Sequence, residues 1–461
     1  MSRVTYKDLG DGLISTELLK KYDVPVPRYT SYPTVPFWSS TPTSQEWLQS
    51  LDRAFQNANV SWALYMHIPF CETLCTYCGC NTVIGRSHKI EEPYVRHLHQ
   101  ELELYSNGVS NLRSRPLKQL HLGGGTPTFL SAPNLDKLLD GILKNLKVAA
   151  NLEASVEVDP RRTNRSQLEV LRHFGFSRVS MGVQDFSPEV QRLVNRIQPK
   201  EKTAELTRVA RELGYESVNY DLIYGLPSQT PESFLRTVID TIELRPDRIA
   251  LYSLAVVPWV KPQQRLFREQ ELPSGVTKWK LYELASEQFL KHGYVQIGMD
   301  HFALPNEALA RACDNKTMRR NFMGYTEHKT DVLLGLGVSA ISETPDCFHQ
   351  NEKVLSRYEN CVNKGYLPTL RGHKLDDEDR RCREQILQFM TQGRVDFQND
   401  EQKLDVTKFL SSMFVDELVR VDGATLILTE KGRPFLRNAC VAFDMRLRRH
   451  SPEAQVFSLA L

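Results

Sequence analysis

The sequence has no long hydrophobic run, no marked excess of one charge and no dense pattern of cysteines. No apolar stretch approaches the roughly 20 residues that a membrane-spanning helix needs, and the N-terminus, MSRVTYKDLGDG, lacks the apolar core of a secretory signal. The 58 Lys and Arg residues balance 56 Asp and Glu residues, so the excess is too small for a general nucleic-acid binder. These absences predict a globular cytoplasmic protein with no nucleic-acid partner and no insertion into a membrane.

The 9 cysteines are too sparse for a disulfide scaffold, and an odd number of cysteines cannot all pair within one chain. Four of them, Cys71, Cys75, Cys78 and Cys80, fall within ten residues. This clustering indicates a metal centre. The remaining cysteines are scattered, as is typical of small buried hydrophobic residues, and they are Cys313, Cys347, Cys361, Cys382 and Cys440.

The length of 461 residues predicts two or three domains. The stretch up to residue 60 contains PVPRYTSYPTVPFW, whose prolines favour an extended, irregular arm. Beyond about residue 370 the chain is charged and helical, then shows a hairpin turning at Asp422 and Gly423, with a helix expected to begin near Thr429. We therefore expect an N-terminal arm (1–60), a central domain (61–365) and a small, mostly helical, winged-helix-like C-terminal domain (366–461) that packs against the central one.

Short apolar runs alternate with helical patterns in the central domain, which indicates βαβ units and a parallel sheet. Six such units favour an α/β barrel, and a doubly wound open sheet is the alternative that periodicity leaves open. The expected helices span 94–105, 135–146, 167–174, 204–213 and 233–242, and further helix starts lie at Ser187 and Thr230. The expected strands span 63–70, 118–125, 153–159, 177–183, 217–225 and 248–255.

The strongest motif is CETLCTYCGC, which directly follows the first expected strand. Cys71, Cys75 and Cys78 have C-x3-C-x2-C spacing, and loops after barrel strands lie at the functional end of such a fold. Three thiolates on a [4Fe–4S] cube leave one iron free for a ligand. A structural zinc ion, which takes four ligands, is the alternative that spacing leaves open.

This motif resembles the signature of the radical S-adenosylmethionine (SAM) superfamily, and YMHIPFCETLCTYCGCN is similar to that of the oxygen-independent coproporphyrinogen III oxidases. The likeness continues along nearly the whole chain, in the order of that family. The further matching segments are RYTSYPT (28–34), HLGGGTPT (121–128), VEVDPR (156–161), SMGVQDF (180–186), VNR (194–196), NYDLIYGLPSQTPESF (219–234), GMDHFA (298–303), LGVSAIS (336–342) and KGRPFLRNACVAFD near the C-terminus.

The resemblance implies a partial (β/α)6 TIM-like barrel that carries a [4Fe–4S] cluster on Cys71, Cys75 and Cys78. It also implies SAM at the open iron, with a second SAM molecule beside the first. The residues that match SAM-contacting positions of the family are Tyr65, Tyr77, Gly124, Gly125, Thr126, Glu157, Gln184, Arg196, Asp221, Ala255 and Ile341.

The resemblance assigns active-site roles to Tyr65, His67, Cys80, Glu157 and Phe322, and Cys80 matches a family cysteine that does not bind the cluster. Tyr65 and His67 alternate on one strand and so face the same side. One departure concerns Met323, where the usual family residue is glutamine. Methionine offers only a weak sulfur acceptor, so a contact with substrate or SAM at this position would lose polarity. A second departure is the apolar segment YSLAVVPW (252–259).

The reaction implied by the resemblance is the oxidative decarboxylation of two propionate groups of coproporphyrinogen III to vinyl groups. The electrons would come from a low-potential flavodoxin- or ferredoxin-like donor, and we expect a monomer. Two alternatives are a haem-trafficking protein or methyltransferase of the same superfamily, and a structural zinc protein. Cys80 and the RYTSYPT arm favour the oxidase over the haem-trafficking relatives, which generally lack both. The arm residue Arg28 is a candidate partner for a propionate.

Overall fold

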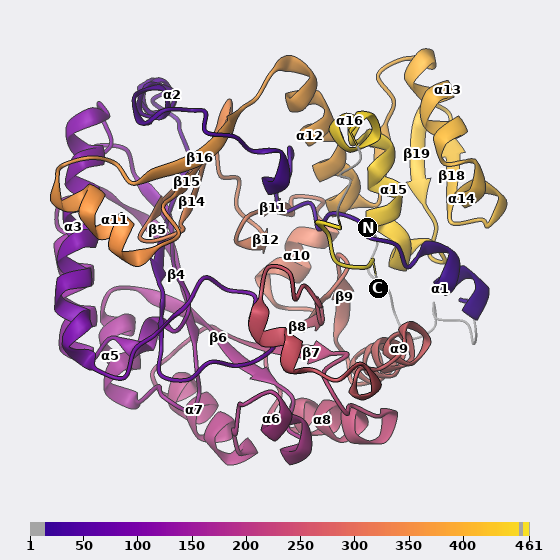
Figure 1. Cartoon of the computed structure of the whole chain (residues 1–461), viewed down its shortest axis with the longest axis horizontal. Coiled ribbons are helices and arrows are strands. Elements are labelled where there is room, and N and C mark those ends of the chain that lie inside the picture. The colour runs from indigo at the N-terminus through magenta and orange to yellow at the C-terminus, as the bar shows by residue number, and fades with distance from the viewer. Residues whose placement is uncertain (1–13, 451–454, 461) are drawn as a thin grey trace.

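The structure is a computed structural model that describes residues 14–450 and 455–460. Its centre is a 12-stranded sheet in the order β16-β15-β14-β13-β1-β4-β5-β6-β7-β8-β10-β9 (Figure 1). Among the described residues, no helix is both long enough and apolar enough to cross a membrane.

Six neighbouring parallel strands form the core of this sheet, and they follow one another in chain order. A doubly wound sheet would reverse its strand order near the middle, whereas an uninterrupted order places every right-handed crossover on one face. The sequence therefore folds as a partial (β/α)6 barrel, and the doubly wound alternative is wrong. The strands are β1 (Trp62–Ile68), β4 (Leu117–Gly124), β5 (Val148–Val158), β6 (Phe176–Gln184), β7 (Ser217–Tyr224) and β8 (Arg248–Ser253).

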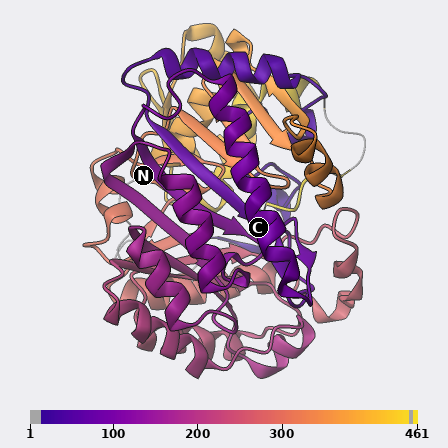
Figure 2. The ribbon, with the colours of Figure 1, turned by 90° about the vertical axis from the view of Figure 1, so that its left-hand side faces the viewer.

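The crossover helices cover the outer face of this sheet, as Figure 2 shows for the first of them. Their buried stripes, such as Leu135, Leu138, Leu139 and Ile142, pack on the strands in one large apolar core. The helices are α3 (Glu91–Gly108), α4 (Ala132–Leu143), α5 (Arg165–His173), α6 (Pro188–Leu193), α7 (Lys200–Glu212) and α8 (Pro231–Leu244).

The barrel stays open, because its two edges are extended rather than joined. On one side β13 (Val332–Leu336) adds in parallel to β1, and antiparallel strands follow up to β16, which lies beyond the domain boundary expected at residue 365. On the other side β10 and β9 run antiparallel to β8. The further elements are β2 (Phe70–Cys71), β3 (Val83–Ile84), α9 (Gly275–Lys291), β9 (Val295–Ile297), β10 (His301–Ala303), α10 (Ala308–Asp314), β11 (Arg319–Asn321), β12 (Gly324–Thr326), β14 (Ile341–Thr344), β15 (Cys347–Asn351), α11 (Leu355–Asn363) and β16 (Thr369–Lys374).

The C-terminal part is helical and carries a three-stranded sheet in the order β17-β19-β18. The expected hairpin forms, but it turns at Gly423 and Ala424 rather than at Asp422 and Gly423, because Asp422 still pairs with Thr425. The helix after it begins later than Thr429. Residues 429–432 form a turn in which the Thr429 hydroxyl donates to the Leu418 carbonyl, and a 3-10 turn then starts at Arg433. The elements are α12 (Asp377–Gln392), β17 (Arg394–Asp396), α13 (Asp400–Phe409), α14 (Ser411–Val415), β18 (Val419–Asp422), β19 (Thr425–Leu428), α15 (Leu436–Cys440) and α16 (Met445–Arg449).

The N-terminal segment contains α1 (Thr16–Tyr22) and α2 (Ser44–Gln56), with the proline-rich stretch between them irregular apart from a short 3-10 turn. Its first half shares an apolar cluster with the C-terminal helices, to which Tyr22 and Tyr29 contribute. The buried Arg437 donates to the carbonyls of Val26 and Pro27. The two ends of the described chain therefore fold together at one side of the barrel.

Candidate active site

A cavity of about 550 Å³ lies inside the open barrel, within the size range of ligand sites. Its wall is built by alternation, because every second residue of a strand faces the lumen. On β5, for example, Glu153, Ser155 and Glu157 contribute to the lining, and Asp159, just after the strand, continues the alternation. The expected site residues that line the cavity are Cys71, Cys75, Tyr77, Cys78, Cys80, Gly124, Gly125, Thr126, Glu157, Gln184, Arg196, Asp221 and Ala255.

The cysteine loop lies at the carboxyl end of β1 and borders the cavity. Cys75 is buried, and Arg161 and Arg196 both donate toward its sulfur at 3.8 Å. The Thr126 hydroxyl lies 3.4 Å from the sulfur of Cys71. Burial raises the pKa of the Cys71 thiol to about 11, whereas a hydrogen bond from Cys80 lowers the pKa of Cys78. Positive donors beside buried thiols are the setting in which thiolate ligands are stabilised.

A segment after β8 holds the cysteine loop by its backbone carbonyls. Lys261 donates to the carbonyl of Cys80 at 2.6 Å and Gln263 to that of Cys78 at 2.9 Å. Gln264 is buried and donates to the carbonyls of Tyr77 and Ala255 at 3.1 and 3.0 Å, while accepting from the Val257 amide. These bonds tie the loop after β1 to the loop after β8.

Tyr65 and His67 lie immediately behind the lining, on β1. His67 Nε2 lies 2.9 Å from the Asn81 carbonyl, so this nitrogen carries the proton and Nδ1 accepts from the Tyr65 hydroxyl at 2.9 Å. Burial lowers the pKa of His67 and favours this neutral form. The Tyr65 ring also stacks on His121 at 5.8 Å between centroids.

The glycine turn after β4 approaches these residues closely. Gly124 has φ +117°, and a Cβ placed there would lie 2.8 Å from the His67 ring. Its amide donates to Glu157 at 3.1 Å, and His121 Nε2 lies 3.4 Å from the other Glu157 oxygen. Although desolvation opposes it, the hydrogen bond from His121 and the Gly124 amide hold the pKa of Glu157 below its usual value. Glu157 is therefore an ionised acceptor at the cavity wall.

Arg196 is held by Asp159 at 3.1 Å and by the Gly182 carbonyl at 2.6 Å. Arg161 pairs with the same carboxylate at 2.7 Å. Burial raises the pKa of Asp159, but Arg196 and Arg161 outweigh it and lower that pKa to about 2. The buried Nε of Arg196 has no hydrogen-bond partner among the residues that the structure describes, which leaves an unused donor on a residue of the cavity lining.

Asp221 lies deeper in the cavity and accepts from Ser180 and Asn219, each at 2.9 Å. Burial and the nearby charge of Glu157 raise its pKa to about 6. Within the described part of the chain, the buried Oδ1 of Asn219 has no hydrogen-bond partner. This part of the wall therefore offers both donors and acceptors to a polar ligand.

Phe322 and Ile341 do not line the cavity. Both pack against an apolar cluster formed by Trp38, Phe348 and Leu375, with the Phe322 and Trp38 ring centroids 5.7 Å apart. Met323, beside Phe322 in the β11–β12 hairpin, does line the cavity. The departure from the family pattern is therefore exposed to whatever the cavity holds.

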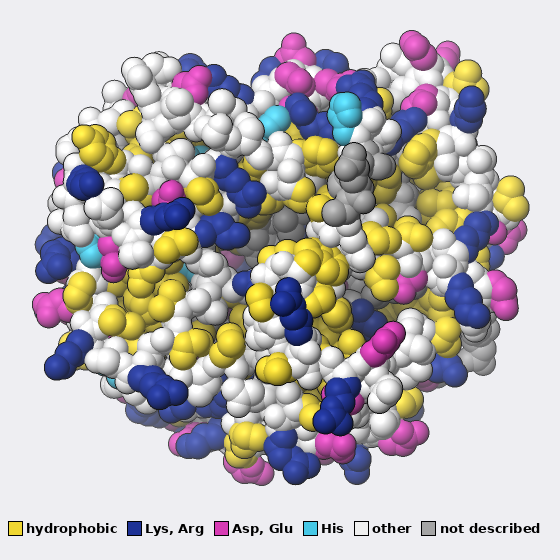
Figure 3. Space-filling model, in the orientation of Figure 1, with side chains coloured by type: hydrophobic (Ala, Val, Ile, Leu, Met, Phe, Trp, Pro, Cys, Tyr) yellow, Lys and Arg dark blue, Asp and Glu magenta, His cyan; other side chains and the backbone are white. Residues whose placement is uncertain are grey.

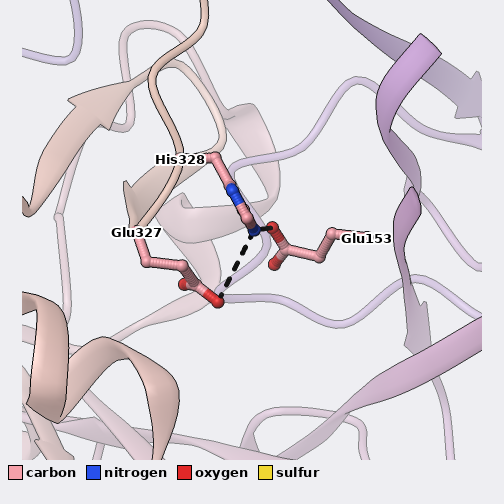
Figure 4. A group of neighbouring side chains, drawn as sticks. All are labelled: Glu153, Glu327 and His328. Carbon is pink, nitrogen blue, oxygen red and sulfur yellow. Dashed lines mark ion pairs between the residues drawn. The ribbon is translucent and has the colours of Figure 1, made fainter. Parts of the chain in front are cut away.

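The floor of the cavity is a charged network that sequence reasoning missed. Figure 4 shows the ring of His328 between Glu153 and Glu327, with ligand atoms of all three within 4.8 Å of one another. This spacing suits a metal ion, but Arg178 already pairs with both carboxylates, at 2.9 Å for Glu327. Arg178 also pairs with Glu307, so these side chains form an ion-pair network beside the cavity. Its only signal in the sequence was the alternation of polar residues along the strands.

The donors present fit an iron–sulfur cluster and SAM. Cys71, Cys75 and Cys78 supply three thiols beside the cavity, whereas a structural zinc ion takes four ligands. Three thiolates leave one iron of a [4Fe–4S] cluster open for a further ligand. The free donor of Arg196 and the free oxygen of Asn219 suit a ligand that, like SAM, has a carboxylate and hydroxyl groups.

The chain is similar to known radical SAM proteins. Residues 65–240 match the model of the radical SAM superfamily. The chain is 39% identical over 442 residues to an oxygen-independent coproporphyrinogen III oxidase of Pseudomonas aeruginosa, covering 94% of this chain and 95% of that protein. It is 40% identical over 441 residues to the enzyme of that name from Escherichia coli, covering 94% and 95%.

The solved structure of coproporphyrinogen III oxidase from Escherichia coli, described as a radical SAM enzyme, superposes with a TM-score of 0.86. It is 40% identical and covers 91% of this chain and 98% of that one. These findings confirm the resemblance on which the oxidase interpretation depends, and the structural zinc interpretation is wrong. The chain belongs to the family of oxygen-independent coproporphyrinogen III oxidases, within the radical SAM superfamily.

Proposed function

We propose that this chain converts coproporphyrinogen III to protoporphyrinogen IX without molecular oxygen, by oxidative decarboxylation of two propionate groups to vinyl groups. The observation that carries the proposal is that one barrel cavity gathers the cysteine triplet, the glycine turn and the polar residues of β5, β6 and β7. Each vinyl group requires loss of one hydrogen atom, one electron and CO2 from a propionate. The hydrogen atom would pass to the 5′-deoxyadenosyl group of SAM, and the electron to a one-electron acceptor.

Cys71, Cys75 and Cys78 would hold three irons of a [4Fe–4S] cluster, leaving one for the methionine part of SAM. When bound, the cluster and SAM supply an electron and a 5′-deoxyadenosyl radical that removes hydrogen from the β-carbon of a propionate. The chain itself has to orient SAM and keep water away from the radical. The backbone of Gly124, Gly125 and Thr126, with Glu157 and Arg196 around it, is placed to orient SAM.

We propose that two SAM molecules bind in the same cavity. Two features support this proposal. The cavity has a volume of about 550 Å³, and its polar lining residues extend from Gly124 on β4 to Ala255 beyond β8. Gln184, Asp221 and the free Asn219 oxygen lie in this spread, away from the glycine turn. Cys80 would act beside the reacting atoms, and Tyr65 and His67 would act from behind the lining. Phe322 and Ile341 do not line the cavity and would act indirectly, through the apolar cluster with Trp38.

The substrate carries anionic propionates, and Arg28 of the N-terminal segment lines the cavity. Its guanidinium donates to the Ser253 carbonyl at 3.0 Å, which leaves further donors for a carboxylate. We propose that Arg28 binds a propionate, so that the arm closes over the substrate. An Arg28→Ala variant with unchanged KM for coproporphyrinogen III would refute this role.

We further propose that the chain acts as a monomer in the cytoplasm and takes its electrons from a low-potential protein carrier. The cytoplasmic assignment follows from the chemistry, because cysteine ligands must remain reduced to bind a cluster. All 9 cysteines are free thiols in the structure.

The test of the proposal is an anaerobic assay of reconstituted protein with a chemical reductant, SAM and coproporphyrinogen III, followed by analysis of the tetrapyrrole products. We expect a divinyl product from the wild type and none from a Cys75→Ala variant, together with loss of the iron and sulfide content in that variant. Cleavage of SAM without vinyl formation would refute the oxidase function and favour a methyltransferase or haem-trafficking relative. Zinc in place of iron would refute the cluster.

A further inference from the structure

Three segments surround the cysteine loop on the protein surface: residues 81–89, 190–197 and 255–268. The first segment pairs with the loop through Cys71 and Ile84. The second segment is joined to the loop by two hydrogen bonds. The Thr76 amide donates to the Val194 carbonyl at 3.1 Å, and the Asn195 side chain donates to the Leu74 carbonyl at 2.8 Å. The third holds the carbonyls of Tyr77, Cys78 and Cys80, as described above. We call the exposed side chains of these segments the collar.

The collar carries mainly positive charge. Its three segments contain seven Lys and Arg residues and no Asp or Glu, whereas the whole chain has 58 basic and 56 acidic residues. Glu189 and Glu269 directly adjoin two of the segments, and Arg268 pairs with Glu271 at 4.0 Å. Within the cysteine loop itself, the acidic Glu72 pairs with Arg162 at 2.8 Å. The basic residues are Arg86, Lys89, Arg192, Lys261, Arg265 and Arg268 at the surface, with Arg196 buried.

The collar also exposes large apolar side chains. Leu266 is 72% exposed and Ile197 57% exposed, and Ile84, Leu193, Trp259 and Val260 are exposed beside them. Figure 3 shows hydrophobic side chains gathered at the middle of the face, with Lys and Arg side chains among and around them. An apolar centre with charged side chains around it is the composition of a protein–protein interface, and it differs from an ordinary solvated surface.

We propose that the collar is the docking surface for an acidic one-electron carrier protein of the flavodoxin or ferredoxin kind. The inference rests on the proposed function, in which electrons reach the cysteine centre from outside the chain. The partner's chemistry follows from the collar: acidic groups to match six exposed or half-exposed cations, and a small apolar area around its redox group. Docking here brings the carrier against the segments that hold the cysteine loop.

Such a complex is expected to be small and short-lived, as electron-transfer complexes are. Its charge would act mainly on the rate of encounter, and the effect would weaken as salt screens it. The apolar side chains would supply the contact itself. The affinity of the complex and its dependence on salt can both be measured without the decarboxylation reaction.

The test uses a charge-reversal variant, Arg86→Glu/Arg192→Glu/Arg265→Glu, with one substitution in each segment. None of these side chains contacts the cavity or holds the cysteine loop. The matched control is Lys118→Glu/Lys147→Glu/Arg394→Glu, which changes the net charge equally at exposed positions. Lys118 and Lys147 lie at the opposite end of the barrel strands, and Arg394 lies on β17.

The probes are a purified acidic flavodoxin and a purified acidic [2Fe–2S] ferredoxin, each mixed anaerobically with reconstituted full-length protein. For at least one carrier we expect the collar variant to lose affinity and reduction rate by on the order of tenfold or more at low salt. At high salt, the difference in affinity and reduction rate between the collar variant and the wild type should become smaller, because salt screens the charges. The control variant should match the wild type, and reduction by dithionite should be equal in all three proteins.

Equal affinity of the collar variant and the wild type would overturn the proposal, as would equal losses in the collar and control variants. Failure of both carriers to bind the wild type would overturn it too. Failure of the decarboxylation assay with dithionite would instead count against the proposed function, because that assay does not involve the carrier. The two failures are therefore distinguishable.

Discussion

At the scale of single residues, the site depends on close approaches that only small or correctly oriented groups allow. Gly124 faces the neutral ring of His67, which in turn is fixed by Tyr65 and by the Asn81 carbonyl. The same glycine presents its amide to Glu157. Gly124 therefore contacts both His67, on the strand before the cysteine loop, and Glu157, which we expect to contact SAM.

We predict that Gly124→Ala lowers the affinity for SAM by about tenfold or more and destabilises the protein by about 1–3 kcal/mol. The new Cβ would lie 2.8 Å from the His67 ring and 2.9 Å from the Ile68 carbonyl, at a φ of +117°. Equilibrium binding of SAM to reconstituted protein measures the first effect and denaturant unfolding the second. Gly79→Ala is the control, because its Cβ would meet nothing within 4 Å, and equal behaviour of the two variants would contradict the prediction.

Met323 stands where the family usually has glutamine, and a substitution at this position tests whether the difference alters substrate binding. Because this side chain lines the cavity, Met323→Gln restores an amide that can donate and accept. We predict that KM for coproporphyrinogen III falls by up to about tenfold, which is the effect of one hydrogen bond, while the affinity for SAM stays the same. An unchanged KM, or a change in SAM affinity alone, would contradict the prediction that Met323 faces the substrate.

Sequence reasoning located residues that lie close to a motif and missed those that meet only in three dimensions. The cysteine triplet and the glycine turn stand out because all of their residues lie within a few positions of one another in the chain. Arg178 and Glu327 are far apart in the chain and meet only because the β11–β12 hairpin folds back into the barrel. For the same reason, no pattern indicated that Phe322 and Ile341 would share a cluster with Trp38.

At the scale of elements, the six parallel strands were predictable because each alternates buried aliphatic residues with lumen-facing polar ones. The antiparallel extensions β14–β16 and β9–β10 were not, since they are short and their burial depends on partners elsewhere in the chain. The segment after β8 is another case. It has no regular pattern, yet its glutamines satisfy the backbone of the cysteine loop.

We predict that Gln264→Ala makes the reconstituted protein lose its iron several-fold faster to a chelator, with little change in overall fold. The substitution leaves the Tyr77 and Ala255 carbonyls and the Val257 amide without their buried partner, at a cost of about 1–3 kcal/mol for each unsatisfied group. Iron release followed by absorbance measures the effect. Arg265→Ala, an exposed neighbour, is the control, and equal release rates for both variants would contradict the role assigned to Gln264.

At the scale of the whole molecule, the chain couples its barrel to peripheral parts through a few buried polar groups. Glu101 on α3 is fully buried and accepts from the Gly337 amide, Asn351 and Tyr358 at 2.8, 2.6 and 2.7 Å. These partners belong to β15, α11 and the turn after β13. Burial raises the pKa of Glu101 to about 7, although these hydrogen bonds oppose the shift.

This carboxyl makes stability depend on pH in a definite direction. The folded protein binds the Glu101 proton more tightly than the unfolded chain, where the pKa of glutamate is about 4.3. The stability from Glu101 is therefore fully present below that pH and is lost as the pH rises through about 7. We predict that the unfolding free energy of the wild type, relative to Glu101→Gln, falls by up to about 1.4 kcal/mol per pH unit between these values. Urea titrations of both proteins across this pH range measure the difference between their unfolding free energies. If the stability of the wild type relative to Glu101→Gln stayed constant or increased with pH, the prediction would be wrong.

We propose that the cavity beside Cys71, Cys75 and Cys78 holds the groups that generate a radical, which then removes hydrogen from a propionate of the substrate. The measurement that tests it most directly uses coproporphyrinogen III labelled with deuterium at the β-carbons of its propionates. After anaerobic turnover with SAM and dithionite, the 5′-deoxyadenosine is analysed by mass spectrometry. We predict deuterium in 5′-deoxyadenosine, in step with formation of vinyl groups. Unlabelled 5′-deoxyadenosine alongside unreacted tetrapyrrole would contradict the claim.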